Sequence, residues 1–195
     1  MPRRIAVAAL VGILVTALVL IGAGEVLSRP AVRFIGPPPL DFPARVVQID
    51  NTPTGPVFGW FAPGQTGMGA VLLFHGVRAD RTQMLARARF LHRAGYATLL
   101  VDLPGHGESA GERITFGARE AAGVSASLQY IRQLLPNERL GIIGVSLGAA
   151  STVLARPSPA PDAVVLESMY PTIVEAVEDR LMVHLGSMGP RLAPL

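Results

Sequence analysis

The five residues from Gly144 to Gly148 constrain this chain more than any other stretch of its sequence. They read G-V-S-L-G, which is the pattern G-x-S-x-G. A short apolar run, residues 140–145, leads into the serine, and a run of small residues suited to a helix, residues 147–155, leads out of it. The arrangement predicts a strand, a sharp turn and a helix, with Ser146 at the apex of the turn.

A turn this sharp has consequences for the serine and its neighbours. It holds Ser146 in a strained backbone conformation, and the flanking glycines avoid the clashes that Cβ atoms would cause there. The hydroxyl is then lifted clear of the sheet, where a substrate carbonyl and a base can both reach it. An ordinary Gly-rich turn can have the same G-x-S-x-G sequence pattern. The predicted strand, turn and helix around this pattern are what favour the catalytic interpretation.

The composition excludes several kinds of site and partner. The chain has no cysteine, so it forms no disulfide, thiolate metal site or cysteine nucleophile. Its formal net charge is only +3, and part of that comes from arginines near the N-terminus. The remainder is nearly neutral, so we do not expect nucleic acid as a partner.

Residues 5–24 form an uncharged apolar run behind a short positive head. A helix of this length, rising about 1.5 Å per residue, spans a hydrocarbon core of roughly 30 Å. A cleaved secretory signal has a shorter core of about 7–15 residues and a small-residue site, for which Gly22-Ala23-Gly24 would serve. The length favours an uncleaved membrane anchor over residues 1–28, with a cleaved signal as the alternative.

The flanks of the apolar run bear on its orientation. The two arginines before it favour a cytoplasmic N-terminus, although Arg29 and Arg33 beyond it weaken the bias. We therefore expect the rest of the chain to face outward, in a bacterial cell into the periplasm. Residues 29–44 contain Pro37-Pro38-Pro39 and predict a stiff, extended spacer between the membrane and a domain.

Strand-like and helix-like segments alternate over residues 45–195. The expected strands are residues 45–49, 57–62, 69–74, 97–102, 140–145 and 163–167, and the expected helices are 81–94, 116–135, 147–155 and 173–185. Such alternation predicts an α/β fold in which a mostly parallel sheet has helices on both faces.

Three motifs stand at the ends of successive predicted strands. They are His75-Gly76, the segment D-L-P-G-H-G-E-S at residues 102–109, and Gly144-x-Ser146-x-Gly148. In this order and spacing they resemble the α/β-hydrolase fold over roughly residues 45–185. The details are most similar to its serine-aminopeptidase-like and monoglyceride-lipase-like branch, which includes membrane-anchored bacterial hydrolases.

The resemblance implies a role for the serine and two backbone groups. Ser146 would be the nucleophile. The N–H groups of Leu147 and of Val77, in the loop after His75-Gly76, would form the oxyanion hole that stabilises a tetrahedral intermediate. No metal and no organic cofactor is implied.

The ionisable groups in and near these motifs are expected to be structural. In this family the His75-Gly76 pair shapes the oxyanion loop, and His106 belongs to a structural turn. Asp102 would close that turn by accepting hydrogen bonds from backbone N–H groups. Glu120 is expected to be a solvated or turn-bonded carboxylate on a long helix.

A serine nucleophile works with a base, usually histidine, and an acid that orients the base. These two members of the catalytic triad are harder to assign here. In this fold the acid and the histidine follow strands that come after residues 163–167, so the sequence is expected to be a C-terminally truncated hydrolase, with the beginning of a cap at about residues 169–195. Within the chain, Glu167 is the candidate acid and His184 the candidate base. Each has a plainer interpretation, Glu167 as a structural strand-end carboxylate and His184 as a helix-surface histidine.

These observations lead to one preferred function and two alternatives. The preferred function is a serine hydrolase that cleaves a small-molecule or lipid-like ester, or a peptide N-terminus, through an acyl intermediate on Ser146. One alternative is a hydrolase-like protein without a working triad. The other is an acyltransferase on the same scaffold. The apolar residues between 173 and 185 suit an acyl chain, but the same stripe is typical of helix packing.

Overall fold

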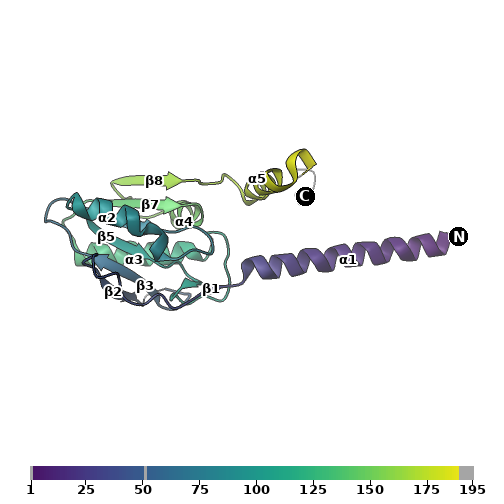
Figure 1. Cartoon of the computed structure of the whole chain (residues 1–195), viewed down its shortest axis with the longest axis horizontal. Coiled ribbons are helices and arrows are strands. Elements are labelled where there is room, and N and C mark those ends of the chain that lie inside the picture. Colours follow the sequence, from purple (N-terminus) through teal and green to yellow (C-terminus); the bar gives the residue numbers. More distant parts are fainter. Residues whose placement is uncertain (1, 51, 189–195) are drawn as a thin grey trace.

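A six-stranded sheet forms the centre of the domain (Figure 1). The computed structural model describes residues 2–50 and 52–188. In spatial order the strands are β2 (Arg45–Ile49), β3 (Val57–Ala62), β5 (Ala97–Val101), β4 (Ala70–Phe74), β7 (Leu140–Val145) and β8 (Ala163–Glu167). The last four run parallel, and β2 and β3 are antiparallel to their neighbours. The expected α/β fold with a mostly parallel sheet is confirmed.

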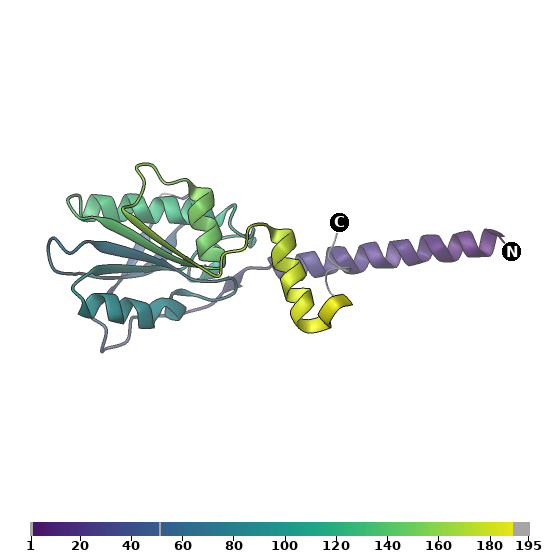
Figure 2. The ribbon, with the colours of Figure 1, turned by 90° about the horizontal axis from the view of Figure 1, so that it is seen from above.

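Helices cover both faces of this sheet, as Figure 2 shows. One face carries α3 (Glu120–Leu134) and α4 (Leu147–Ala155), and the other carries the 3₁₀ helix η1 (Arg81–Met84) followed by α2 (Leu85–Arg93). Every residue of β4 and β5 is buried. Strands buried on both faces are nearly continuous apolar runs, which is why these two segments show no alternating pattern.

Two expected helices begin differently from their predicted ranges because side chains bond to the backbone near their starts. The segment expected at 81–94 starts as 3₁₀, and the Asp80 carboxylate caps it by accepting from Thr82 N at 2.8 Å. The segment expected from 116 becomes helical only at Glu120, whose carboxylate accepts from Thr115 N and Gly117 N, both at 2.8 Å. Glu120 is therefore a buried, turn-bonded carboxylate.

The N-terminal helix α1 (Pro2–Ser28) projects away from the domain (Figure 1). Its segment Leu10–Ser28 has a mean hydropathy of 2.4, is wholly unburied and is long enough to cross a membrane. The segment that follows, expected as a proline-rich spacer, is bonded to the domain: β1 (Ala31–Val32) pairs in parallel with β6 (His106–Gly107). A two-residue strand leaves no periodic pattern, so the sequence did not predict this pairing.

At the other end of the chain, α5 (Ile173–Leu185) and the 3₁₀ helix η2 (Gly186–Met188) follow β8. Thr172 caps α5 by accepting a hydrogen bond from Glu175 N at 3.1 Å. The four parallel strands end at one edge of the sheet, so the loops after β4, β5 and β7 meet there. All three sequence motifs are therefore brought to the same edge.

Candidate active site

Ser146 occupies the sharp turn between β7 and α4. Its backbone has φ +50° and ψ −107°, a conformation that costs a non-glycine residue roughly 1–3 kcal/mol. Its N–H is fixed by the Glu167 carbonyl at 2.8 Å. The Oγ atom makes no hydrogen bond to any described residue, and the side chain is half-buried. The strained serine at the apex, predicted from the spacing, is what the structure shows.

The glycines on either side of Ser146 are required by close backbone approaches. A Cβ atom at Gly148 would overlap the carbonyl group of Phe74, whose carbon would lie at 2.7 Å. A Cβ at Gly144 would lie 2.7 Å from the Ala149 nitrogen. Real Cβ atoms essentially never show such distances, so both positions accept only glycine without a backbone shift. The pattern G-x-S-x-G is here a steric requirement of the turn.

The loop after β4 lies directly beside this serine. A Cβ at Gly76 would stand 3.8 Å from Ser146 Cβ, and Gly148 N donates to the His75 carbonyl at 3.0 Å. Gly76 N donates to Gln83 Oε1 at 2.7 Å, which ties the loop to η1. Sequence reasoning missed Gln83, because nothing in a polar helix position signals a partner seven residues back.

Two backbone N–H groups near Ser146 have no acceptor among the described residues. They belong to Leu147, the first residue of α4, and to Val77, the residue after Gly76. The N-terminus of a helix leaves such groups unpaired and adds a favourable dipole for negative charge. The two predicted oxyanion donors thus lie next to Ser146, one at the first residue of α4 and the other in the loop after β4.

The two histidines of the motifs are buried, and the bonds of His75 fix its form. His75 Nδ1 lies 2.7 Å from the Gly76 carbonyl, and Nε2 accepts from Leu103 N at 3.0 Å. Burial lowers the pKa of His75 to about 3, so the ring is neutral with its proton on Nδ1. Burial likewise lowers the pKa of His106, whose ring lies 5.1 Å from that of His75. The ring of His75 joins the loops after β4 and β5, and the ring of His106 bonds within its own turn, to the Pro104 carbonyl at 3.1 Å.

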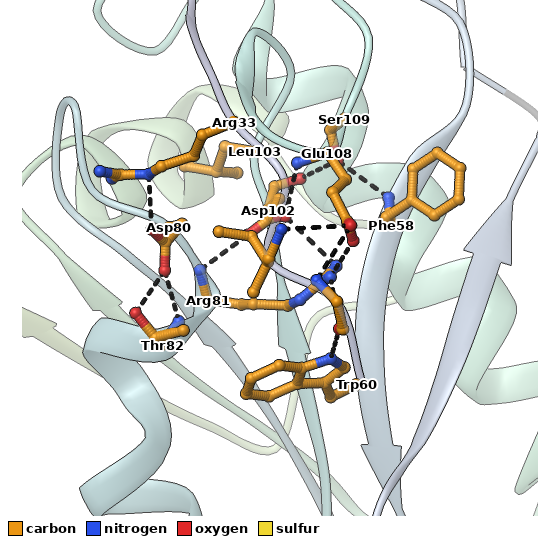
Figure 3. A network of polar contacts seen from close by, with 12 residues as sticks. Arg33, Phe58, Trp60, Asp80, Arg81, Thr82, Asp102, Leu103, Glu108 and Ser109 are labelled. Carbon is orange, nitrogen blue, oxygen red and sulfur yellow. Dashed lines mark hydrogen bonds and ion pairs between the residues drawn. The ribbon is translucent and has the colours of Figure 1, made fainter. Parts of the chain in front are cut away.

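A buried charged cluster links the loops after β4 and β5 (Figure 3). Arg81 is fully buried, forms ion pairs with Asp102 (3.2 Å) and Glu108, and stacks over Trp60 at 5.0 Å. Asp102 also accepts from Arg81 N at 2.7 Å and from Glu108 N at 2.9 Å. The predicted role of Asp102 in closing its turn is therefore what its contacts show. The burial of Arg81 was not predicted.

Burial and charge act in opposite directions on the carboxylates of this cluster. Burial raises the pKa of Asp102 to about 6, against the lowering effect of Arg81 and two backbone N–H groups. At Glu108 burial is outweighed by hydrogen bonds from Gly36 N and Arg81, which lower its pKa. Both carboxylates are therefore paired with Arg81 as anions at neutral pH, and Asp102 takes up a proton before Glu108 on acidification.

The chain just beyond α1 is bonded to the same loops. Arg33 pairs with Asp80 at 2.7 Å and donates to the Arg78 carbonyl at 2.9 Å. Burial of Asp80 is outweighed by hydrogen bonds from Thr82 and by the Arg33 charge, and its pKa is lowered. These contacts reach Arg78 and Asp80, which follow Val77 in the loop after β4.

The candidate acid and base are placed differently. The Glu167 carboxylate forms a two-point ion pair with Arg87, one arm being Arg87 Nε to Oε1 at 3.1 Å. His184 lies on α5, but its side chain is outside the described residues. Within the described part of the chain no three His, Asp or Glu side chains converge in a way that suits a metal ion.

A hollow of about 800 Å³ lies elsewhere, along the starts of β4 and β7. Its walls include Gly69, Tyr96, Arg139 and Asp162, which precede or begin strands, and they do not include Ser146. Because active sites in open α/β sheets form at the carboxyl ends of strands, we do not assign catalysis to this hollow.

Comparison with known proteins agrees with the geometry at the carboxyl edge. Residues 65–193 match the family described as Hydrolase_4, serine aminopeptidase S33. The chain belongs to this family. It is also 31% identical over 121 residues to an uncharacterized protein of Mycobacterium tuberculosis, matched in two strains. That match covers 60% of this chain but only 42% of the relative.

Solved structures with low sequence identity share the fold. The esterase Pf2001 of Pyrococcus furiosus superposes with a TM-score of 0.67 at 23% identity, over 86% of this chain and 70% of the esterase. The protein XC6422 of Xanthomonas campestris, an α/β serine hydrolase without a lid, gives 0.54 at 19% identity, over 68% of this chain and 63% of that one. The Hydrolase_4 chain thus has an α/β-hydrolase fold.

Proposed function

We propose that this member of the family is a serine hydrolase that cleaves esters through an acyl intermediate on Ser146. The observation that carries the proposal is the state of the turn after β7. It holds a serine whose Oγ is unbonded among the described residues, beside two N–H groups that also have no acceptor there. The structural similarity to the esterase Pf2001 favours an ester over a peptide bond as the substrate.

The proposed chemistry assigns each group one step. Ser146 Oγ attacks the ester carbonyl as its proton passes to a base, and the carbonyl oxygen becomes negative. The N–H groups of Leu147 and Val77 donate to that oxygen, and each such donor is worth about 3–4 kcal/mol in other enzymes. The alcohol leaves with a proton, and water then releases the acid and regenerates Ser146.

The scheme also needs a base and an acid that orients it. Arg87 already neutralises the Glu167 carboxylate, which favours its structural interpretation over the acid role. His184 stays the candidate base within the chain. The proposal therefore depends on the nucleophile and the oxyanion donors, which the described residues supply.

We also propose that α1 anchors the protein in a membrane and that the domain lies outside the cytoplasm. The length and mean hydropathy of Leu10–Ser28 support a membrane span, and a cleaved signal sequence would pass the same criterion. The size of the mature protein in the membrane fraction separates the two, because only an uncleaved anchor retains residues 1–28.

Labelling with a fluorophosphonate tests the proposal most directly. The wild-type chain should be labelled, Ser146→Ala should not, and Ser125→Ala on α3 should be labelled like wild type. Ester turnover in Ser146→Ala should fall by on the order of 10³-fold or more. Equal labelling of Ser146→Ala and wild type would overturn the assignment. Absence of labelling in the folded wild type would favour the non-catalytic alternative, and transfer to an added alcohol would indicate an acyltransferase.

A further inference from the structure

The edge of the sheet that carries Ser146 is also the edge to which α1 is attached. In Figure 1 the arrowheads of β7 and β8 point toward the side from which α1 leaves the domain. The loop that follows β5 bonds to the last turn of α1: Ile114 N donates to the Ser28 carbonyl at 2.8 Å, and Arg113 pairs with Glu25 at 2.7 Å. The site and the attachment point therefore share one face.

This attachment is a bonded connection and not a free tether. Ala31 N donates to the Gly105 carbonyl and Arg33 N to the Gly107 carbonyl, both at 2.8 Å. Glu108 then accepts from Gly36 N at 3.1 Å. These bonds fix the chain for several residues beyond α1, so the helix sets the direction in which the domain faces. A domain held this way presents its catalytic edge to the surface that α1 enters.

The side chains exposed along this connection suit the surface of a bilayer. Phe34 is 87% exposed and Val32 is 60% exposed, although both are apolar. Arg29, Arg33 and Arg78 lie exposed near them. Aromatic side chains favour the interface between lipid and water, and arginines favour anionic headgroups. The combination is typical of a surface in contact with lipid and atypical of one in contact with water alone.

Helix α5 adds apolar surface on the same side. Figures 1 and 2 both place it beyond the carboxyl edge, on the side of α1. Several of its apolar side chains are exposed, among them Ile173, Val174, Met182 and Val183. Exposed apolar side chains beside a membrane helix are suited to contact lipid.

We propose that the mouth of the Ser146 site opens onto the bilayer, and that the substrates are esters of membrane amphiphiles whose acyl chains enter from the lipid. The proposal rests on the function and the anchor proposed above. It adds the class of substrate and the direction of entry, which the membership of the family does not supply.

The orientation can be measured without any enzymatic activity. The chain contains no cysteine, so Phe34→Cys and Thr66→Cys each give a single labelling site. Thr66 is exposed in the loop before β4, at the opposite edge of the sheet. The full chain is reconstituted into vesicles of phosphatidylcholine and phosphatidylglycerol and labelled with an environment-sensitive fluorophore. Nitroxide lipids should quench the label at 34 at least about threefold more than that at 66. Equal quenching, or stronger quenching at 66, would overturn the proposal.

The substrate class requires a second measurement. A Val32→Ser/Phe34→Ser variant is compared with wild type on a long-chain fluorogenic ester held in the vesicles and on a short, water-soluble ester. The ratio of the two rates should fall about fivefold, with fluorophosphonate labelling of Ser146 unchanged. An unchanged ratio would overturn the proposed entry from lipid. If neither ester is cleaved by wild type, the proposed hydrolase function fails, and the quenching experiment still decides the orientation.

Discussion

The loops after β5 and β7 follow buried parallel strands at the same edge of the sheet, yet their polar groups are in opposite states. In the first loop Asp102 accepts from two backbone N–H groups and pairs with Arg81, and Ser109 bonds to both Phe58 N and the Asp102 carbonyl. In the second, Ser146 Oγ and the Leu147 N–H have no partner among the described residues. The loop richer in ionisable groups is the scaffold, and the loop with one hydroxyl carries the proposed nucleophile.

The difference follows from what each loop must do. A buried charge is tolerated only when it is paired and hydrogen-bonded, so the carboxylates after β5 are committed to Arg81 and to backbone groups. A nucleophile and its oxyanion donors must stay unpaired until substrate arrives, which is acceptable where solvent can reach them. The two loops should therefore fail in different ways when they are altered.

The largest expected effect is on stability, from Arg81→Met. This change leaves Asp102 buried without its cation, and such losses typically cost about 3–5 kcal/mol of unfolding free energy. Trp60, the single tryptophan of the chain, reports the unfolding by fluorescence, with the full chain in detergent micelles. Arg89→Met is the matched control, because its pair with Asp41 is largely exposed and should be worth less than about 1 kcal/mol. Equal losses in both variants would contradict a special role for the buried cluster.

The next effect should appear in reactivity, from Gly148→Ala. The new Cβ would overlap the Phe74 carbonyl, which no side-chain rotation relieves, so the start of α4 and the Leu147 N–H must shift. A displacement of about 1 Å in such a site costs on the order of 100-fold, and we expect fluorophosphonate labelling of Ser146 to slow by that factor. Gly141→Ala on β7 is the control, since its Cβ would make an ordinary contact with Val71 at 3.6 Å. The prediction fails if the two variants are labelled at the same rate.

The same contrast explains what the sequence could reveal. The sheet, the turn at Ser146 and the turn-closing role of Asp102 were predictable, because apolar runs and glycine spacing are local signals. Arg81 was not, because it is a polar position on a short helical segment, and its burial arises only where the chain after α1 and the loops after β4 and β5 converge. Strand β1 was not predicted, because two residues are too few to show the alternating hydrophobic pattern of a strand. Partnerships over long separations need the fold before they can be recognised.

A smaller effect is expected where the chain beyond α1 supports the loop that carries Val77, the proposed second oxyanion donor. Arg33→Gln removes the pair with Asp80 and the bond to the Arg78 carbonyl, next to Val77. Because Arg33 is half exposed, the loss should be under about 1 kcal/mol, which corresponds to a decrease in kcat of up to about fivefold. KM for a soluble ester should not change, because Arg33 is a positioning residue. Arg119→Gln, which removes a solvent-exposed pair with Glu112, should leave both constants unaltered. A rise in KM with unchanged kcat would exclude the positioning role.

The smallest effect is the absence of a titration at His75. Its pKa of about 3 predicts that ¹⁵N NMR of the labelled imidazole will show the neutral Nδ1–H form from pH 8 to about 4.5. A measurement of unfolding free energy against pH would not reveal the state of His75, because His75 and Asp102 affect it in opposite directions. Between pH 6.5 and 3 the unfolded chain binds a proton at His75 that the folded one does not, so stability falls on acidification by about 1.4 kcal/mol per pH unit. Asp102, with its pKa raised from 3.8 to about 6, takes up a proton in the folded state first and acts in the opposite direction. A direct titration of His75 near pH 6.5 would mean that the ring is open to solvent, which would contradict its structural role.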